Sequence, residues 1–102
     1  MLNNNGRVVM ISGANRGIGL AIARNLYQAG YSLSLGSRSI DSLKGIIENS
    51  TEDRIINCYF DANDKSSHKN WVIDTINKFS KIDCLINNAG IVESVSVDDE
   101  ED

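Results

Sequence analysis

The sequence contains no proline, one histidine and two cysteines. The single histidine, His68, has no cysteine or carboxylate partner at metal-ligand spacing, so we expect a solvated helix residue and no metal site. Cys58 and Cys84 are far apart and fall in apolar segments, which favours two buried free thiols over a zinc site. Metal and thiol chemistry are therefore poor candidates for the function.

Long apolar runs are also absent. No run approaches the roughly 18 residues that a membrane-crossing helix needs. The first seven residues contain no basic region followed by a long apolar stretch, so they do not form a secretory signal. We expect a soluble, cytoplasmic protein without a membrane partner.

The charge is unevenly distributed. The formal net charge is −4, but six of the 14 acidic residues lie within residues 93–102, and the other 8 face 10 lysines and arginines, a balance of +2. Neither value is typical of the basic field of a nucleic-acid-binding protein. With 102 residues, 41% of them hydrophobic, the chain can form one modest core.

Apolar periodicity alternates between two patterns along the chain. Short apolar runs predict strands at residues 7–12, 31–35, 54–60 and 83–86. Helical spacing follows the first run over residues 17–29, with Gly30 at the expected helix end. It returns in a segment containing Ile40, Leu43, Ile46 and Ile47 after a possible Ser39 cap.

The last helix of this alternation is predicted to start at Asp64 as its cap, with Val72, Ile76 and Phe79 on its buried stripe. The order β-α-β-α-β-α-β with helix-length crossovers indicates a parallel sheet that has helices on both faces. We therefore predict an α/β fold, a Rossmann-like doubly wound parallel sheet, truncated to about four strands in order 3-2-1-4 with three helices.

A glycine-rich loop joins the first predicted strand to the first helix. It reads Ser-Gly-Ala-Asn-Arg-Gly-Ile-Gly from residue 12 to residue 19. Glycines let the backbone turn sharply and approach a ligand, and the following helix presents open N–H groups to a diphosphate. We assign cofactor binding in this loop to Gly13, Asn15, Arg16, Gly17, Ile18 and Gly19.

The spacing G-x-x-x-G-x-G differs from both G-x-G-x-x-G and the P-loop. With Ser12 before it and Asn-Asn-Ala-Gly at residues 87–90 after the fourth strand, it resembles the short-chain dehydrogenase/reductase family. The resemblance covers the whole chain but only the first part of the family's length. It implies a nicotinamide dinucleotide as cofactor.

The residues at the end of the second predicted strand indicate which nucleotide the chain binds. Dinucleotide folds that bind NAD usually carry an acid there, against the ribose 2′-hydroxyl. This chain has Ser37 and Arg38 instead, and Arg16 could face the same group. A hydroxyl and guanidinium groups suit a 2′-phosphate, so we predict NADP (NADPH). The alternative is that both arginines are ordinary surface residues.

Further contacts follow from the resemblance. It implies that Asp61 and Ala62 hold the adenine, that Asn88, Ala89 and Gly90 lie against the cofactor ribose, and that Asn87 ties neighbouring strands together. A strand-end turn that merely contains an acid is the alternative for Asp61.

The catalytic residues of the family cannot be assigned. No tyrosine of this sequence is followed four positions later by lysine, so the family's Tyr-x-x-x-Lys pair is missing and we assign no catalytic residue. Residues 1–102 are expected to form the N-terminal portion of one NAD(P)-binding domain. Residues 91–102 read as a loop and the start of a fourth helix capped by Asp98, with a free acidic tail as the alternative.

Three functions are compatible with these observations. The first is the cofactor-binding part of an oxidoreductase that transfers hydride between NADPH and a small carbonyl or alcohol substrate; by the resemblance its intact parent is a homo-oligomer. The second is a non-catalytic nucleotide-binding relative. The third is an inert fragment.

Overall fold

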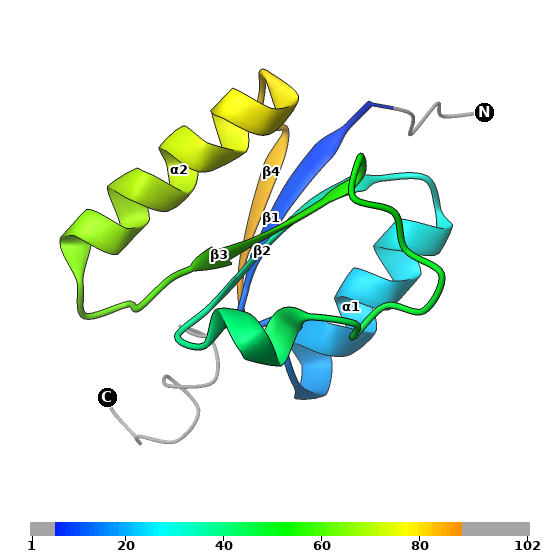
Figure 1. Cartoon of the computed structure of the whole chain (residues 1–102), viewed down its shortest axis with the longest axis horizontal. Helices are drawn as coiled ribbons and strands as arrows, with labels where there is room; N and C mark the ends of the chain where they lie inside the picture. The colour runs from blue at the N-terminus through cyan, green and yellow to red at the C-terminus, as the bar shows by residue number, and fades with distance from the viewer. Residues whose placement is uncertain (1–5, 89–102) are drawn as a thin grey trace.

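Four parallel strands form the centre of the computed structural model, which describes residues 6–88. The strand order β3-β2-β1-β4 confirms the predicted order and fold class (Figure 1). The elements along the chain are β1 Val8–Ser12, α1 Gly17–Gln28, β2 Ser32–Ser37, the 3₁₀ helix η1 Ile40–Leu43, β3 Ile55–Tyr59, α2 Lys65–Phe79 and β4 Cys84–Asn87.

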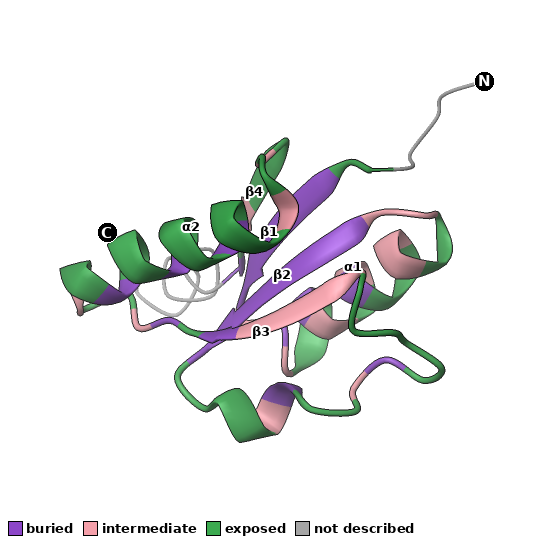
Figure 2. Ribbon diagram, turned by 45° about the horizontal axis from the view of Figure 1, so that its top comes forward, coloured by how far each residue is buried: buried purple, intermediate pink, exposed green. Residues whose placement is uncertain are grey.

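The two central strands are covered on both sides. All residues of β1 and β2 are buried, whereas β3 is mostly half-buried (Figure 2). Because residues alternate between faces, β1 contributes Val9 and Ile11 to the core on the α1 side and Met10 to the core beneath α2. The continuous apolar run of β1 is therefore explained by a parallel strand between two helical layers.

The predicted end of α1 and the predicted start of α2 are both confirmed. After α1, Gly30 adopts a φ of 101°, a conformation that side chains with a Cβ rarely take. At the start of α2 the Asp64 carboxylate accepts a hydrogen bond from the Ser66 N–H at 3.0 Å. The Ser66 hydrogen bonds hold the pKa of Asp64 below its usual value.

The second predicted helix is wrong beyond its first turn. Only the four residues of η1 are helical, and Lys44 is already extended. Left-handed backbone at Gly45, with φ of 72°, and at Asn49, with φ of 61°, prevents an α-helix from continuing. Leu43 and Ile47 are nevertheless buried, as the apolar spacing predicted, whereas Ile40 is 40% exposed and Ile46 is half-buried. Ser39 precedes η1 but makes no side-chain cap.

The predicted buried stripe of α2 is wrong at two of its three positions, whereas Phe79 is half-buried. Val72 is 40% exposed and Ile76 45% exposed, whereas Ser67, Trp71 and Thr75 face the sheet. The reason is a buried polar cluster. Trp71 Nε1 donates to Ser34 Oγ at 2.8 Å, Ser34 Oγ lies 2.7 Å from Thr75 Oγ1, and the Thr75 hydroxyl donates to the Trp71 carbonyl at 2.7 Å.

The prediction of two buried thiols is wrong for Cys84, which is exposed, and confirmed for Cys58, which is buried. Burial raises the pKa of the Cys58 thiol to about 11, which keeps it protonated near neutral pH. Cys84 begins β4, the strand at the end of the order, and its neighbour Leu85 is 58% exposed. Edge position and incomplete cover thus explain the exposure.

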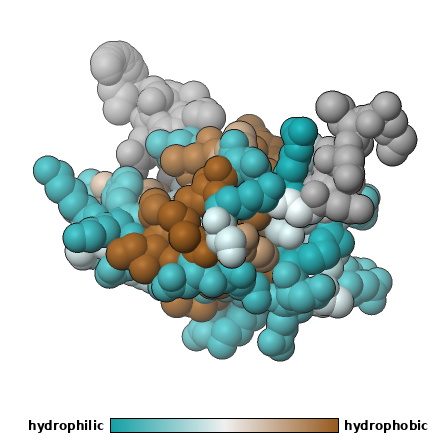
Figure 3. Space-filling view, turned by 90° about the horizontal axis from the view of Figure 1, so that it is seen from above, coloured by the Kyte–Doolittle hydropathy of each residue, from teal (hydrophilic) through white to brown (hydrophobic). Residues whose placement is uncertain are grey.

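Exposed apolar side chains gather on the side of the molecule that carries α2 and β4. Leu85 pairs in register with Met10, which lies beneath α2, so Leu85 faces the same side of the sheet as that helix. Figure 3 shows hydrophobic side chains concentrated on this side. We call Val72, Ile73, Ile76 and Leu85 the α2–β4 apolar surface. Within residues 6–88, no helix has the length and apolar character needed to cross a membrane.

Candidate functional site

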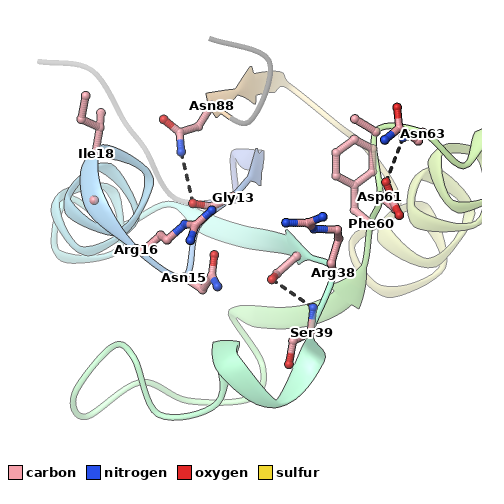
Figure 4. A pocket seen from close by; sticks show the side chains of 13 residues that line it. Gly13, Asn15, Arg16, Ile18, Arg38, Ser39, Phe60, Asp61, Asn63 and Asn88 are labelled. Carbon is pink, nitrogen blue, oxygen red and sulfur yellow. Dashed lines mark hydrogen bonds between the residues drawn. The ribbon is translucent and has the colours of Figure 1, made fainter. Parts of the chain in front are cut away.

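A cleft of about 580 Å³ opens at the carboxyl ends of β1, β2 and β3 and at the start of α1 (Figure 4). This is the end of a doubly wound sheet at which ligands bind. Its volume lies within the range of small-molecule and cofactor sites. The lining residues are Gly13, Asn15, Arg16, Gly17, Ile18, Ser37, Arg38, Ser39, Phe60, Asp61, Ala62, Asn63 and Asn88.

The loop between β1 and α1 forms one wall. Gly13 and Gly17 have φ of 64° and 59°, so both positions favour glycine. The Gly13 N–H donates to the Gly36 carbonyl at 2.9 Å, which fastens the loop to the end of β2. Helix α1 begins at Gly17 with no side-chain cap. The first N–H groups of any α-helix lack partners within the helix, and here no side chain caps them, so this end of α1 suits an anion such as a diphosphate.

Gly19 packs closely behind the loop. It does not line the cleft. A Cβ at Gly19 would clash with the Gly13 carbonyl oxygen and lie 2.7 Å from Asn88 Nδ2. Gly19 is thus required where α1 packs behind the loop.

Asparagines at the end of β4 hold the loop and the strands together. Asn88 is buried, lines the cleft and donates from Nδ2 to the Gly13 carbonyl at 3.2 Å. Ser12 Oγ donates to Asn87 Oδ1 at 3.1 Å, which joins β1 to β4 as expected for Asn87. Ala89 and Gly90, like the predicted helix start at residues 91–102, lie outside the described residues.

Two guanidinium groups face each other across the cleft. Arg16 comes from the start of α1 and Arg38 from the end of β2, and Figure 4 shows both side chains directed into the space between these elements. Neither forms an ion pair with a carboxylate of residues 6–88. Both positive charges are therefore available to an anionic ligand.

Hydroxyl groups follow the same strand end. Ser37 is 7% exposed, and its Oγ accepts a hydrogen bond from the Ser39 N–H at 3.2 Å and lies 3.3 Å from Ser42 Oγ. Ser39 also lines the cleft, although no cofactor contact was predicted for it.

The end of β3 forms the opposite wall. Asp61 Oδ1 accepts the Asn63 N–H at 2.9 Å, and the Asp61 N–H donates to Ser67 Oγ at 3.0 Å, so the start of α2 holds the turn in place. Phe60 is 6% exposed and contacts Trp71 and His68, with ring centroids 4.8 and 4.6 Å apart. Sequence reasoning assigned Phe60 to the strand and missed its place in the cleft, which its position next to Asp61 could have indicated.

No group of three or more histidine, cysteine, aspartate or glutamate side chains within the described part of the chain could hold a metal ion. The cleft instead combines glycine backbone, an open helix start, two guanidinium groups and hydroxyls. These features on a doubly wound sheet define a Rossmann-like dinucleotide-binding class of fold.

Comparison with known proteins identifies the family. The family model described as short chain dehydrogenase matches residues 7–102, and the chain belongs to this family. It is 41% identical over 91 residues to agropine synthesis reductase of Rhizobium rhizogenes, covering 89% of this chain and 21% of that protein. It is 35% identical over 100 residues to 11-beta-hydroxysteroid dehydrogenase-like 2 of Arabidopsis thaliana, covering 95% of this chain and 32% of that protein.

A solved structure is also similar to this chain. A short-chain dehydrogenase/reductase from Brucella melitensis, described as a glucose/ribitol dehydrogenase, matches with a TM-score of 0.75 and 28% identity. The match covers 79% of this chain and 35% of that one. The chain therefore spans about a fifth to a third of the length of these relatives.

Proposed function

We propose that this chain is the NADP(H)-binding part of an oxidoreductase, with a cleft selective for the 2′-phosphate of the cofactor. The observation that carries the proposal is the pair Arg16 and Arg38 on two walls of one cleft, with Ser37 in the place where NAD-binding folds usually have an acid. In this assignment the open start of α1 holds the diphosphate and the two guanidinium groups hold the 2′-phosphate.

The cleft fits the adenosine half of such a cofactor. Glycine at residue 17 leaves open space where a side chain would otherwise stand, since nothing lies within 4 Å of a Cβ built there. Asp61 and Ala62 line the end of the cleft that the adenine would occupy, and Phe60 adds an aromatic wall. Asn88 limits the cleft on the β4 side, where the resemblance places the ribose, with Ala89 and Gly90 following.

The reaction proposed for the intact protein is hydride transfer between NADPH and a small carbonyl or alcohol substrate in the cytoplasm. When bound, the nicotinamide would give a hydride to a carbonyl substrate or, in its oxidised form, accept one from an alcohol. Since these 102 residues contain no Tyr-x-x-x-Lys pair, we expect the chain alone to bind cofactor without turnover, and the homo-oligomeric parent to contain the pair beyond residue 102. A parent without it would favour a non-catalytic nucleotide-binding protein.

Calorimetric titration of the chain with NADPH and with NADH tests the cofactor assignment. Arg38→Asp removes a charge-assisted contact and introduces repulsion, so NADPH affinity should fall roughly 10- to 100-fold while NADH affinity changes far less. Lys69→Asp makes the same charge change at an exposed position on α2 outside the cleft and should leave the preference unchanged. Equal binding of both nucleotides by the unmodified chain would contradict the proposal.

A further inference from the structure

Ser42 contacts a hydroxyl of the cleft without lining the cleft itself. It lies on η1, is half-buried, and stands 3.3 Å from Ser37 Oγ. Ser37 lines the cleft, whereas Ser42 does not. Any influence of Ser42 on a ligand must therefore pass through Ser37 or through the backbone of the turn.

The proton count of the serine cluster fixes the direction of the contact. The Ser42 hydroxyl has a single proton, and it is donated to the Ser39 carbonyl at 2.6 Å. In the contact between the two hydroxyls, Ser37 is then the donor and Ser42 the acceptor. Ser37 Oγ also accepts the Ser39 N–H at 3.2 Å. Ser37 thus directs its proton toward η1 and away from the cleft, and has one further lone pair for a ligand.

This arrangement affects the two cofactors differently. A 2′-phosphate accepts hydrogen bonds, so it needs the Ser37 proton, whereas the 2′-hydroxyl of NAD can donate to the Ser37 lone pair. Building on the function proposed above, we infer that Ser42 is a specificity-determining positioning residue that restrains the Ser37 hydroxyl and so weakens recognition of the 2′-phosphate. The two arginines supply the preference for NADP, and Ser42 limits it.

The test compares adenosine 2′,5′-bisphosphate with adenosine 5′-monophosphate, which differ by the 2′-phosphate. Ser42→Ala should bind the bisphosphate roughly 3- to 10-fold more tightly than the unmodified chain, because a hydrogen bond to a charged group becomes available. The monophosphate affinity should change little. A merely structural role predicts the opposite sign, since a loosened turn weakens both ligands.

Two further comparisons isolate the hydroxyl. Ser42→Thr and Ser42→Val have nearly the same shape, so only the valine variant should show the gain, and the threonine variant should restore the original affinity. In Ser37→Ala the gain from adding Ser42→Ala should vanish, because the proton in question is gone. Ser50→Ala, at an exposed position outside the cleft, controls for serine replacement as such.

The outcomes separate this inference from the proposed function. Suppose that the unmodified chain prefers the bisphosphate. If Ser42→Ala then brings no gain in bisphosphate affinity, or brings the same gain in the Ser37→Ala background, the role of Ser42 is overturned and the NADP assignment stands. If the unmodified chain shows no preference for the bisphosphate, the NADP assignment is contradicted. The role of Ser42 is still supported in that case if bisphosphate affinity rises only in variants that keep Ser37 and lack the hydroxyl at residue 42.

Discussion

Gly19 shows how one missing side chain determines the geometry of the cleft. Its Cα packs so closely behind the loop that an added Cβ would meet the Gly13 carbonyl oxygen and the Asn88 amide. That carbonyl is the group to which Asn88 donates. The loop, the first turn of α1 and the end of β4 are thus held together at one point, and the conformation of the loop depends on that point.

Gly19→Ala should therefore destabilise the chain by about 1–3 kcal/mol through overpacking and weaken NADPH binding. Urea unfolding followed by circular dichroism measures the first effect and calorimetry the second. Ala21→Ser, at an exposed position two residues further along α1, serves as the control. Unchanged stability and unchanged affinity in Gly19→Ala would contradict the packing described for this site.

The glycines and arginines of the site could be predicted from the sequence because their signals are local. A turn with positive φ at Gly13 and Gly17 needs glycine whatever the rest of the fold does. The contacts of Ser37 with Ser42 and of Asn88 with Gly13 were not predictable in the same way. The first contact depends on the backbone conformation of η1, and the second depends on the sheet, which brings residues 13 and 88 together.

At the scale of elements, α2 illustrates the limit of apolar periodicity. Its sequence offers Val72 and Ile76 as an apolar stripe, yet the helix buries Thr75 completely. The hydroxyl of Thr75 is satisfied within a buried ring formed with Ser34 and Trp71. Ser34 lies 41 positions earlier on β2, so no pattern within α2 could reveal this pairing. A polar residue is stable in a core when its partners are present.

Thr75→Ala should consequently cost about 1–3 kcal/mol of unfolding free energy, because the Ser34 hydroxyl loses its acceptor in a buried place. Ile76→Ala, on the neighbouring exposed position, should stay within about 0.5 kcal/mol. Thermal and urea unfolding of both variants would decide the orientation of the helix. If Ile76→Ala proved the more damaging, the face assigned to the sheet would be wrong.

In the segment after β2, the sequence predicted two buried side chains but not the backbone conformation. Apolar residues at helical spacing correctly predicted that Leu43 and Ile47 are buried. The backbone between them is not helical, because Gly45 turns with positive φ. In this segment the spacing identified two side chains that face the core, whereas the backbone conformation that brings them there depends on local turn residues.

For the molecule as a whole, the α2–β4 apolar surface is the main departure from a fully covered sheet. Leu85 and Ile76 remain 58% and 45% exposed, and β4 is the last strand of the order. An exposed apolar patch beside an edge strand favours association with other chains.

The order of the strands was predictable from the alternation of elements, since right-handed crossovers leave few topologies.

We expect the 102-residue chain to self-associate through this surface at increasing concentration. Leu85→Lys should shift its sedimentation toward that of a monomer, because a charge disfavours burial of the surface. Ile40→Lys changes an apolar residue of comparable exposure on η1, which packs on the other side of the sheet, and should leave association unaltered. Identical sedimentation of the Leu85 variant and the unmodified chain would rule out this surface as the site of contact.

The close packing of Trp71 on β2 has a practical consequence. A Cβ at Gly36 would lie 2.8 Å from Trp71 Cζ2, so the indole rests directly against the backbone one residue before Ser37. It is also the only tryptophan of the chain and is 3% exposed. The protein thus contains a single, buried tryptophan beside its cleft. Its emission, excited selectively over that of the three tyrosines, can follow unfolding and nucleotide titrations without any added label.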